Sequence, residues 1–188
     1  MDFAETASII VTAIDVTAEI IMNPLKLIKM KAIELMKKNQ IQRKLVEYRI
    51  IGKRTNVEQI QVKDSKDAYD FIMNEIMDKD TFSVSEAFFA LYIDAGNHIK
   101  GFAKISDGGV TNVIADPRII YVHALNCLAN EIIVTHNHPS GYTRPSAEDK
   151  ILTKRLSEAG DFLHVRLKDH IICGEDSYYS FLDHGDIL

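Results

Sequence analysis

Two histidines, a serine and an aspartate close together carry the clearest chemical signal in this chain. The stretch EIIVTHNHPSGYTRPSAEDK ends an apolar run in His136 and His138 and continues to Ser146 and Asp149. Side chains two positions apart in an extended segment point the same way, so both imidazoles project together and Asn137 points away. Ser146 is a favourable helix N-cap, which places Asp149 in the first helical turn, facing back toward the loop. Two imidazoles and one carboxylate make three protein ligands, the number that a catalytic zinc site takes while its fourth position stays open for water.

Each half of this pattern has an ordinary explanation when taken alone. A His-x-His pair is common on protein surfaces, and Ser-x-x-Asp most often marks a capping box that only starts a helix. The two together, on one turn between a strand and a helix, are much less expected by chance. We therefore predict a Zn²⁺ site with His136, His138 and Asp149 as ligands. The chain has neither the H-x-E and P-C-x-x-C of nucleobase deaminases nor the H-E-x-x-H of zincins.

Strands and helices are predicted to alternate around this stretch. Helical periodicity with a cap residue at Ser65 and at Asp116 predicts two helices, and a third begins at Ser146. Apolar or alternating runs predict strands at 87–94, 98–106, 131–135 and within VRLKDHIICG, and extended chain over 45–62. This alternation favours an α/β fold, a sheet with helices packed on it.

The N-terminal part of the chain differs from the rest in charge. Residues 24–54 hold ten Lys or Arg and two Glu, a net +8 in a chain whose total is -5. Asn23-Pro24 resembles a helix start, so we predict a helical N-terminal extension over 1–44 and a domain over 45–188. An apolar stretch near the N-terminus is interrupted by Asp15 and Glu19, which argues against a signal peptide and a membrane span.

Cysteine content bears on the compartment. The chain has two cysteines, Cys127 and Cys173, without C-x-x-C spacing. Two are too few for a disulfide scaffold, so a reducing, cytoplasmic setting is the simplest interpretation. Neither lies where a metal ligand is needed, and we expect both to be small buried hydrophobic residues.

The site motif also resembles a known family. His-x-His-Pro, with Ser eight and Asp eleven residues after the second His, is similar to the JAMM motif of the JAB/MPN metallopeptidases. HNHPSG, RPSAED, DHIICG and YYSF resemble the RadC branch, over roughly 45–188. The resemblance implies a JAB/MPN-type mixed β-sheet flanked by helices, and zinc-dependent hydrolysis of a peptide or isopeptide amide in a peptide or protein substrate. RadC proteins often carry an N-terminal helix-hairpin-helix region, which residues 1–44 do not resemble.

The JAMM pattern also requires an upstream glutamate. Glu131 begins the same strand as His136, but five residues of strand put it roughly 16 Å away and on the opposite face. Glu86 matches the family's placement of Glu ahead of an apolar strand, although an exposed acid between a helix and a strand is the ordinary alternative. The resemblance makes Glu86 the carrier of a proton from water to the leaving amine, and Ser146 a hydrogen-bond donor to the oxyanion.

Other interpretations stay open at this point. Asp169 and His170 could orient a metal ligand from behind, or could be a structural pair. A protein that binds nucleic acid is the main alternative, since RadC proteins are associated by custom with DNA repair and the basic segment could contact phosphates. Tyr48 is the only aromatic residue in that segment, so support for stacking on bases is weak. A metal-containing binding module is a third interpretation, and the sequence does not fix the oligomeric state.

Overall fold

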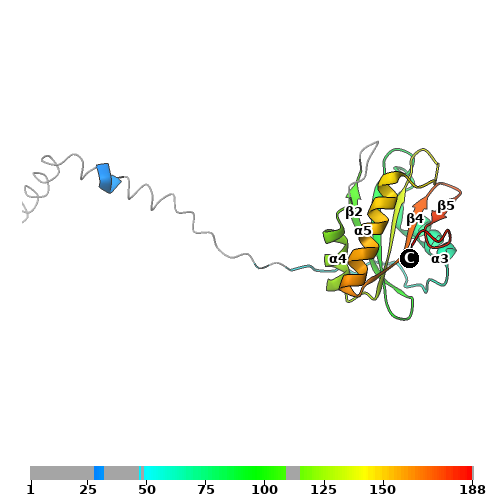
Figure 1. The fold of residues 1–188 in the computed structure, drawn as a ribbon, viewed down its shortest axis with the longest axis horizontal. Helices are drawn as coiled ribbons and strands as arrows, with labels where there is room; N and C mark the ends of the chain where they lie inside the picture. The colour runs from blue at the N-terminus through cyan, green and yellow to red at the C-terminus, as the bar shows by residue number, and fades with distance from the viewer. Residues whose placement is uncertain (1–27, 32–46, 48, 109–114, 188) are drawn as a thin grey trace, which may run out of the picture. The chain divides into compact units, whose positions relative to one another are not determined.

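The computed structural model describes residues 28–31, 47, 49–108 and 115–187 (Figure 1). By compactness the chain divides into two units, Met1–Arg49 and Ile50–Leu188. Of the first unit the structure describes little beyond a helical turn at 28–31. The predicted N-terminal helix and the boundary near residue 44 therefore stay predictions. The predicted metal ligands all lie in the second unit.

The second unit is built on a mixed β-sheet. Within the described residues the sheet has five strands, in the order β2-β1-β3-β4-β5. They are β1 Ala87–Ile93, β2 Ile99–Asp107, β3 Glu131–Asn137, β4 Arg166–Cys173 and β5 Tyr178–Ser180. β1 is antiparallel to β2 and β3, β3 is parallel to β4, and β5 is antiparallel to β4. Parallel neighbours need a crossover, and helix α5 (Ala147–Leu163) supplies it. The predicted α/β class, a mixed sheet flanked by helices, is confirmed.

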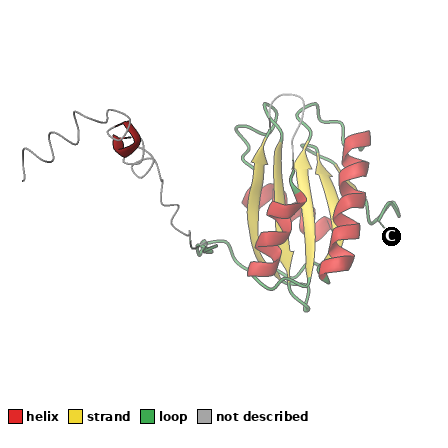
Figure 2. Cartoon of the chain, turned by 60° about the vertical axis from the view of Figure 1, so that its left-hand side comes forward, coloured by secondary structure: helices red, strands yellow, loops and turns green. Residues whose placement is uncertain are grey.

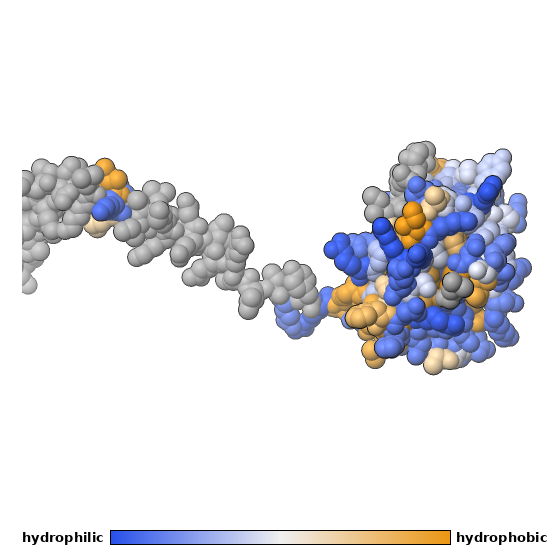
Figure 3. Space-filling model, in the orientation of Figure 1, coloured by the Kyte–Doolittle hydropathy of each residue, from blue (hydrophilic) through white to orange (hydrophobic). Residues whose placement is uncertain are grey.

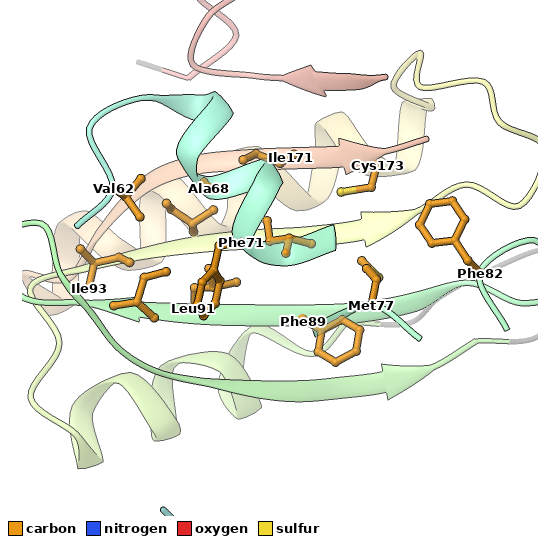
Figure 4. Packing of buried hydrophobic residues seen from close by; sticks show 13 residues of the cluster. Val62, Ala68, Phe71, Met77, Phe82, Phe89, Leu91, Ile93, Ile171 and Cys173 are labelled. Carbon is orange, nitrogen blue, oxygen red and sulfur yellow. The ribbon is translucent and has the colours of Figure 1, made fainter. Parts of the chain in front are cut away.

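Helices cover both faces of this sheet (Figure 2). On one face α4 (Pro117–Asn126) and α5 enclose a core that includes Phe88 and Leu156. On the other face lies α3 (Ser65–Phe71), which continues as the π-helix η1 (Ile72–Ile76). Figure 4 shows the core on this second face, where Phe71 meets Leu91 of β1. Burial on both faces explains why β1 and β3 are continuous apolar runs.

The surface in view is mainly hydrophilic, with hydrophobic side chains in places (Figure 3). Exposed apolar residues include Ile119, Val122 and Leu125, spaced by three along α4. α4 is thus apolar on its outer side as well as on the side that faces the sheet. None of the helices in the described part of the chain is long and apolar enough to cross a membrane.

The predicted cap of the first helix is wrong by one residue. Asp64 is the N-cap of α3, and its Oδ1 accepts a hydrogen bond from Asp67 N at 2.9 Å. Ser65 is instead buried, and its hydroxyl donates to Asp183 Oδ2 at 2.5 Å. Both residue types are favourable caps, so the local sequence did not separate them. Burial of Ser65 against the C-terminal part of the chain decided between them.

Two other predicted boundaries also differ. The extended structure predicted over 45–62 forms no strand in its described residues, apart from an isolated bridge between Gln61 and His98. Most of that segment is exposed, so its alternating side chains face no second layer. The helical periodicity after Asp116 predicts a helix through Ala129, but α4 ends at Asn126, because Leu128 takes the left-handed conformation (φ 52°).

Candidate metal centre

The end of β3 sends two consecutive side chains to opposite faces of the sheet. His136 points toward α5 and is 3% exposed. Asn137, predicted to point away, is buried on the other side. Its Nδ2 donates to the carbonyls of Phe82 and Ser85 at 2.6 and 2.9 Å, and its Oδ1 accepts from Ala87 N at 2.8 Å. Asn137 therefore fixes the chain that leads into β1.

His138 follows directly after β3 and is held by a tight turn. Its backbone N–H donates to Cys173 O at 3.1 Å, and its carbonyl accepts from Gly141 N at 2.9 Å. Gly141 has φ 77°, a conformation that glycine adopts without strain. The turn brings Tyr142 O to 2.6 Å from His138 Nδ1. A carbonyl only accepts, so Nδ1 carries the proton and Nε2 presents a lone pair to the site.

The N-terminus of α5 supplies the carboxylate. Ser146 is the N-cap, and it forms a capping box with Asp149. Ser146 Oγ accepts from Asp149 N at 3.1 Å, and Asp149 Oδ2 accepts from Ser146 N and Oγ at 2.8 and 2.7 Å. One carboxylate oxygen is thus held by the cap. The other, Oδ1, lies 3.2 Å from His136 Nε2.

The three predicted ligands come together. His136 Nε2 lies 3.0 Å from His138 Nε2, and His138 Nε2 lies 3.7 Å from Asp149 Oδ2. Ligand atoms about 2.0–2.1 Å from one tetrahedral zinc would be about 3.3 Å apart. The separations of 3.0, 3.2 and 3.7 Å lie on both sides of that value. Among the described residues, His136, His138 and Asp149 are the His, Cys, Asp or Glu side chains that lie close enough together to hold one metal ion.

The charges of the site also suit a cation. Burial acts to raise the pKa of Asp149, but the neighbouring imidazoles of His136 and His138, and then the hydrogen bond from Ser146, lower it far below its usual range. Asp149 therefore stays ionised. The pKa of His138 is raised, first by the Asp149 carboxylate, whose Oδ2 lies 3.7 Å from Nε2, and further by the Tyr142 carbonyl and the charge of Glu86, while burial acts to lower it. The site thus attracts either protons or a metal ion.

Asp169 and His170 alternate along β4 and have separate surroundings. His170 is fully buried, with Nε2 3.0 Å from His136 Nδ1 and Nδ1 2.7 Å from Thr153 Oγ1. Burial, and then the nearby His136, lowers the pKa of His170 well below its usual value. Asp169 instead accepts from Ser180 Oγ and Leu182 N at 2.7 and 3.0 Å. Of the predicted pair, His170 contacts a ligand and Asp169 holds the C-terminal segment.

The two candidate glutamates lie at opposite ends of the sheet. Glu86 is half-buried and immediately precedes β1, where Phe88 pairs with His136. Its charge adds to the raised pKa of His138, after Asp149 and the Tyr142 carbonyl. Glu131 pairs with Ile93 at the far end of β3, and its carboxylate accepts from Arg166 Nε at 3.0 Å and from Lys168 Nζ at 2.9 Å. Glu86 is thus the candidate beside the three ligands.

Two residues with a part in the site were not predicted. Asn137 was expected only to face away, yet it fixes the segment that carries Glu86. Thr153 lies four residues after Asp149 on α5, so helical spacing alone could have placed it on the same side.

The cysteines lie outside the metal group: Cys173 is buried as predicted, whereas Cys127 is only partly buried.

Comparisons with known proteins identify the family of this chain. A model of the RadC-like JAB domain family matches residues 62–186. A UPF0758 protein of Flavobacterium johnsoniae is 37% identical over 139 residues, which are 72% of this chain and 59% of the relative. A UPF0758 protein of Streptococcus uberis is 36% identical over 160 residues, 85% of this chain and 66% of the relative. The chain spans roughly half the length of most relatives that it matches. It belongs to the RadC-like JAB domain family.

Proposed function

We propose that this domain is a zinc-dependent hydrolase that cleaves an amide bond in a peptide or isopeptide substrate. The convergence of two imidazole nitrogens and an ionised carboxylate within 3.0–3.7 Å carries this proposal. Imidazole nitrogen and carboxylate oxygen are ligands that zinc accepts, and three protein ligands leave a position for water. When bound, zinc would act as a Lewis acid and lower the pKa of a water molecule toward about 7.

His136, His138 and Asp149 would hold the ion. His138 is oriented by Tyr142 O and Asp149 by Ser146, so neither ligand has to reorganise before binding. Support of this kind from outside the ligand set orients metal ligands in many proteins. The three therefore form a prepared site on rigid elements, the end of β3 and the start of α5.

Glu86 is proposed to move the proton. Its carboxylate would take a proton from the attacking water as the oxygen–carbon bond forms, and would deliver it to the amine nitrogen as the carbon–nitrogen bond breaks. Half-burial beside His138 suits an acid that has to exchange protons with a bound substrate. Asn137 holds the Glu86 segment through three hydrogen bonds, which supports a fixed position for the carboxylate.

Ser146 is proposed to stabilise the oxyanion of the tetrahedral intermediate. Its hydroxyl proton now points to Asp149 Oδ2 at 2.7 Å, so it would have to turn toward the substrate. Asp149 Oδ2 would then still accept from Ser146 N at 2.8 Å. The hydroxyl can therefore serve the substrate without releasing the carboxylate.

Metal content measured beside hydrolysis tests the proposal. The purified protein should hold about one zinc per chain, and His138→Ala should remove that zinc and the hydrolysis of a panel of peptide and isopeptide substrates. His123→Ala on α4 is the matched control and should keep both. Full zinc occupancy in His138→Ala, or equal hydrolysis after chelation, would overturn the proposal.

A further inference from the structure

A continuous row of hydrogen bonds leads from His136 into the protein core. His136 Nδ1 lies 3.0 Å from His170 Nε2, and His170 Nδ1 lies 2.7 Å from Thr153 Oγ1. Thr153 Oγ1 in turn lies 2.7 Å from the backbone carbonyl of Asp149. The row therefore starts on the ring of one metal ligand and ends on the backbone of another.

The direction of every proton in this row follows from its last member. The Asp149 carbonyl can only accept, so the single hydroxyl proton of Thr153 points to it. Thr153 Oγ1 must then accept from His170, which places the proton of His170 on Nδ1. A neutral imidazole with a proton on Nδ1 has a lone pair on Nε2. His170 Nε2 therefore accepts from His136 Nδ1–H, and His136 Nε2 keeps its lone pair for the metal.

The opposite arrangement leaves buried groups without partners. If His136 carried its proton on Nε2, then Nδ1 and His170 Nε2 would need another proton between them. His170 would then point a lone pair at Thr153, whose one proton cannot satisfy both His170 and Asp149 O. His170 and Thr153 are 0% and 2% exposed, so water does not replace the lost bond.

We propose that His170 and Thr153 are positioning residues that fix His136 as the Nδ1–H tautomer and so direct its Nε2 lone pair to the metal. This deepens the proposed function, because it concerns the same site and assumes a metal there. A histidine ligand usually has its tautomer set by the partner of its other nitrogen, commonly a carboxylate or carbonyl. Here a neutral second histidine fills that role, and a helical threonine fixes its proton.

Packing around His170 allows the hydrogen bond to be removed while the shape is kept. The ring of His170 stacks on Phe181 at 4.8 Å between centroids and lies 5.8 Å from Phe88. His170→Phe keeps an aromatic ring in this apolar setting but has no acceptor. His170→Gln places an amide oxygen near the former Nε2 and can still accept from His136. The two variants separate a packing role from a hydrogen-bonding role.

Nitrogen NMR of the metal-free protein reads the tautomers directly. In the wild type, His136, His138 and His170 should each carry their proton on Nδ1. His170→Phe should move the proton of His136 away from Nδ1, whereas His170→Gln should keep it there. An unchanged Nδ1–H at His136 in His170→Phe, or a His136 Nδ1 without a proton in the wild type, would overturn the inference.

Zinc affinity, measured by competition with a chelator, gives the second readout. His170→Phe should bind zinc roughly 10–100-fold more weakly, and His170→Gln should recover most of that loss. Equal zinc affinity in all three proteins would also overturn the inference. If His170→Phe does not fold, Thr153→Val takes its place, with Thr153→Ser as the variant that restores the hydroxyl. A wild type that binds zinc but hydrolyses no substrate would sink the proposed function and leave these results standing.

Discussion

Asp169 should make the stability of this protein depend on pH in a direction unusual for a carboxylate. Burial raises the pKa of Asp169 from its ordinary 3.8 to about 6, against hydrogen bonds from Ser180, Leu182 N and His170 N that lower it. Asp169 is 2% exposed, so solvent screens this effect little. Between pH 4 and 6 the folded state binds the proton and the unfolded state has lost it. The free energy of unfolding contributed by Asp169 therefore falls as pH rises through that window.

The size of this fall follows from the pKa difference. A rise of about two units corresponds to about 3 kcal/mol, at 1.36 kcal/mol per unit. Asp169→Asn has no proton to lose and keeps an acceptor for the two backbone N–H groups. The stability of the wild type minus that of Asp169→Asn should thus decrease by about 3 kcal/mol from pH 3 to pH 7, and should be constant above pH 7.

Urea unfolding at several pH values, with a chelator present, measures this difference. Subtracting the free energy of unfolding of Asp169→Asn from that of the wild type cancels the contribution of the site histidines, which both proteins share. Ser180→Ala removes a hydrogen bond that lowers the pKa of Asp169, so it should extend the fall to higher pH. A difference that stays constant with pH would refute the raised pKa. A difference that grows with pH would mean that the three hydrogen bonds outweigh burial.

Three further predictions concern the site and the basic segment. Glu86→Gln should keep zinc at wild-type stoichiometry and lower turnover roughly 10²–10⁴-fold, because an amide cannot carry the proton. Glu131→Gln is the control and should leave turnover nearly unchanged. Zinc loss in Glu86→Gln would contradict this prediction. Ser146→Ala should lower kcat while the protein retains zinc. It should also lower the free energy of unfolding in urea by about 1 kcal/mol, because α5 loses its capping box. An unchanged kcat would show that Ser146 takes no part in the reaction. DNA binding by the full chain should be weak at physiological salt. The nucleic-acid interpretation would be favoured if binding were tight and salt-sensitive and were lost on neutralising Lys26, Lys29, Lys37 and Lys38.

Local rules of the sequence were enough to bring the three predicted ligands together. Alternation along a strand put His136 and His138 on one side of the chain, and a cap at Ser146 placed Asp149 in the first turn of α5. These predictions involve neighbours within a few residues, where backbone geometry alone fixes direction. The sequence left Asp169 and His170 as one candidate pair, and only the structure shows that His170 contacts His136 while Asp169 binds the C-terminal segment.

Only the packed sheet decided the remaining contacts. The antiparallel pairing of Phe88 with His136 brings Glu86 to the site, and the parallel pairing of β3 with β4 brings His170 behind His136. Register between strands depends on how two whole surfaces fit, which no short stretch encodes. The N-cap of α3 was also decided by a distant contact: Ser65 is buried against the C-terminal segment, and Asp64 is the N-cap. The sequence alone thus determined which residues could bind a metal and placed Ser146 beside Asp149. The tertiary structure determined that Glu86 and His170 lie near these residues, because Glu86 and His170 are far from them along the chain.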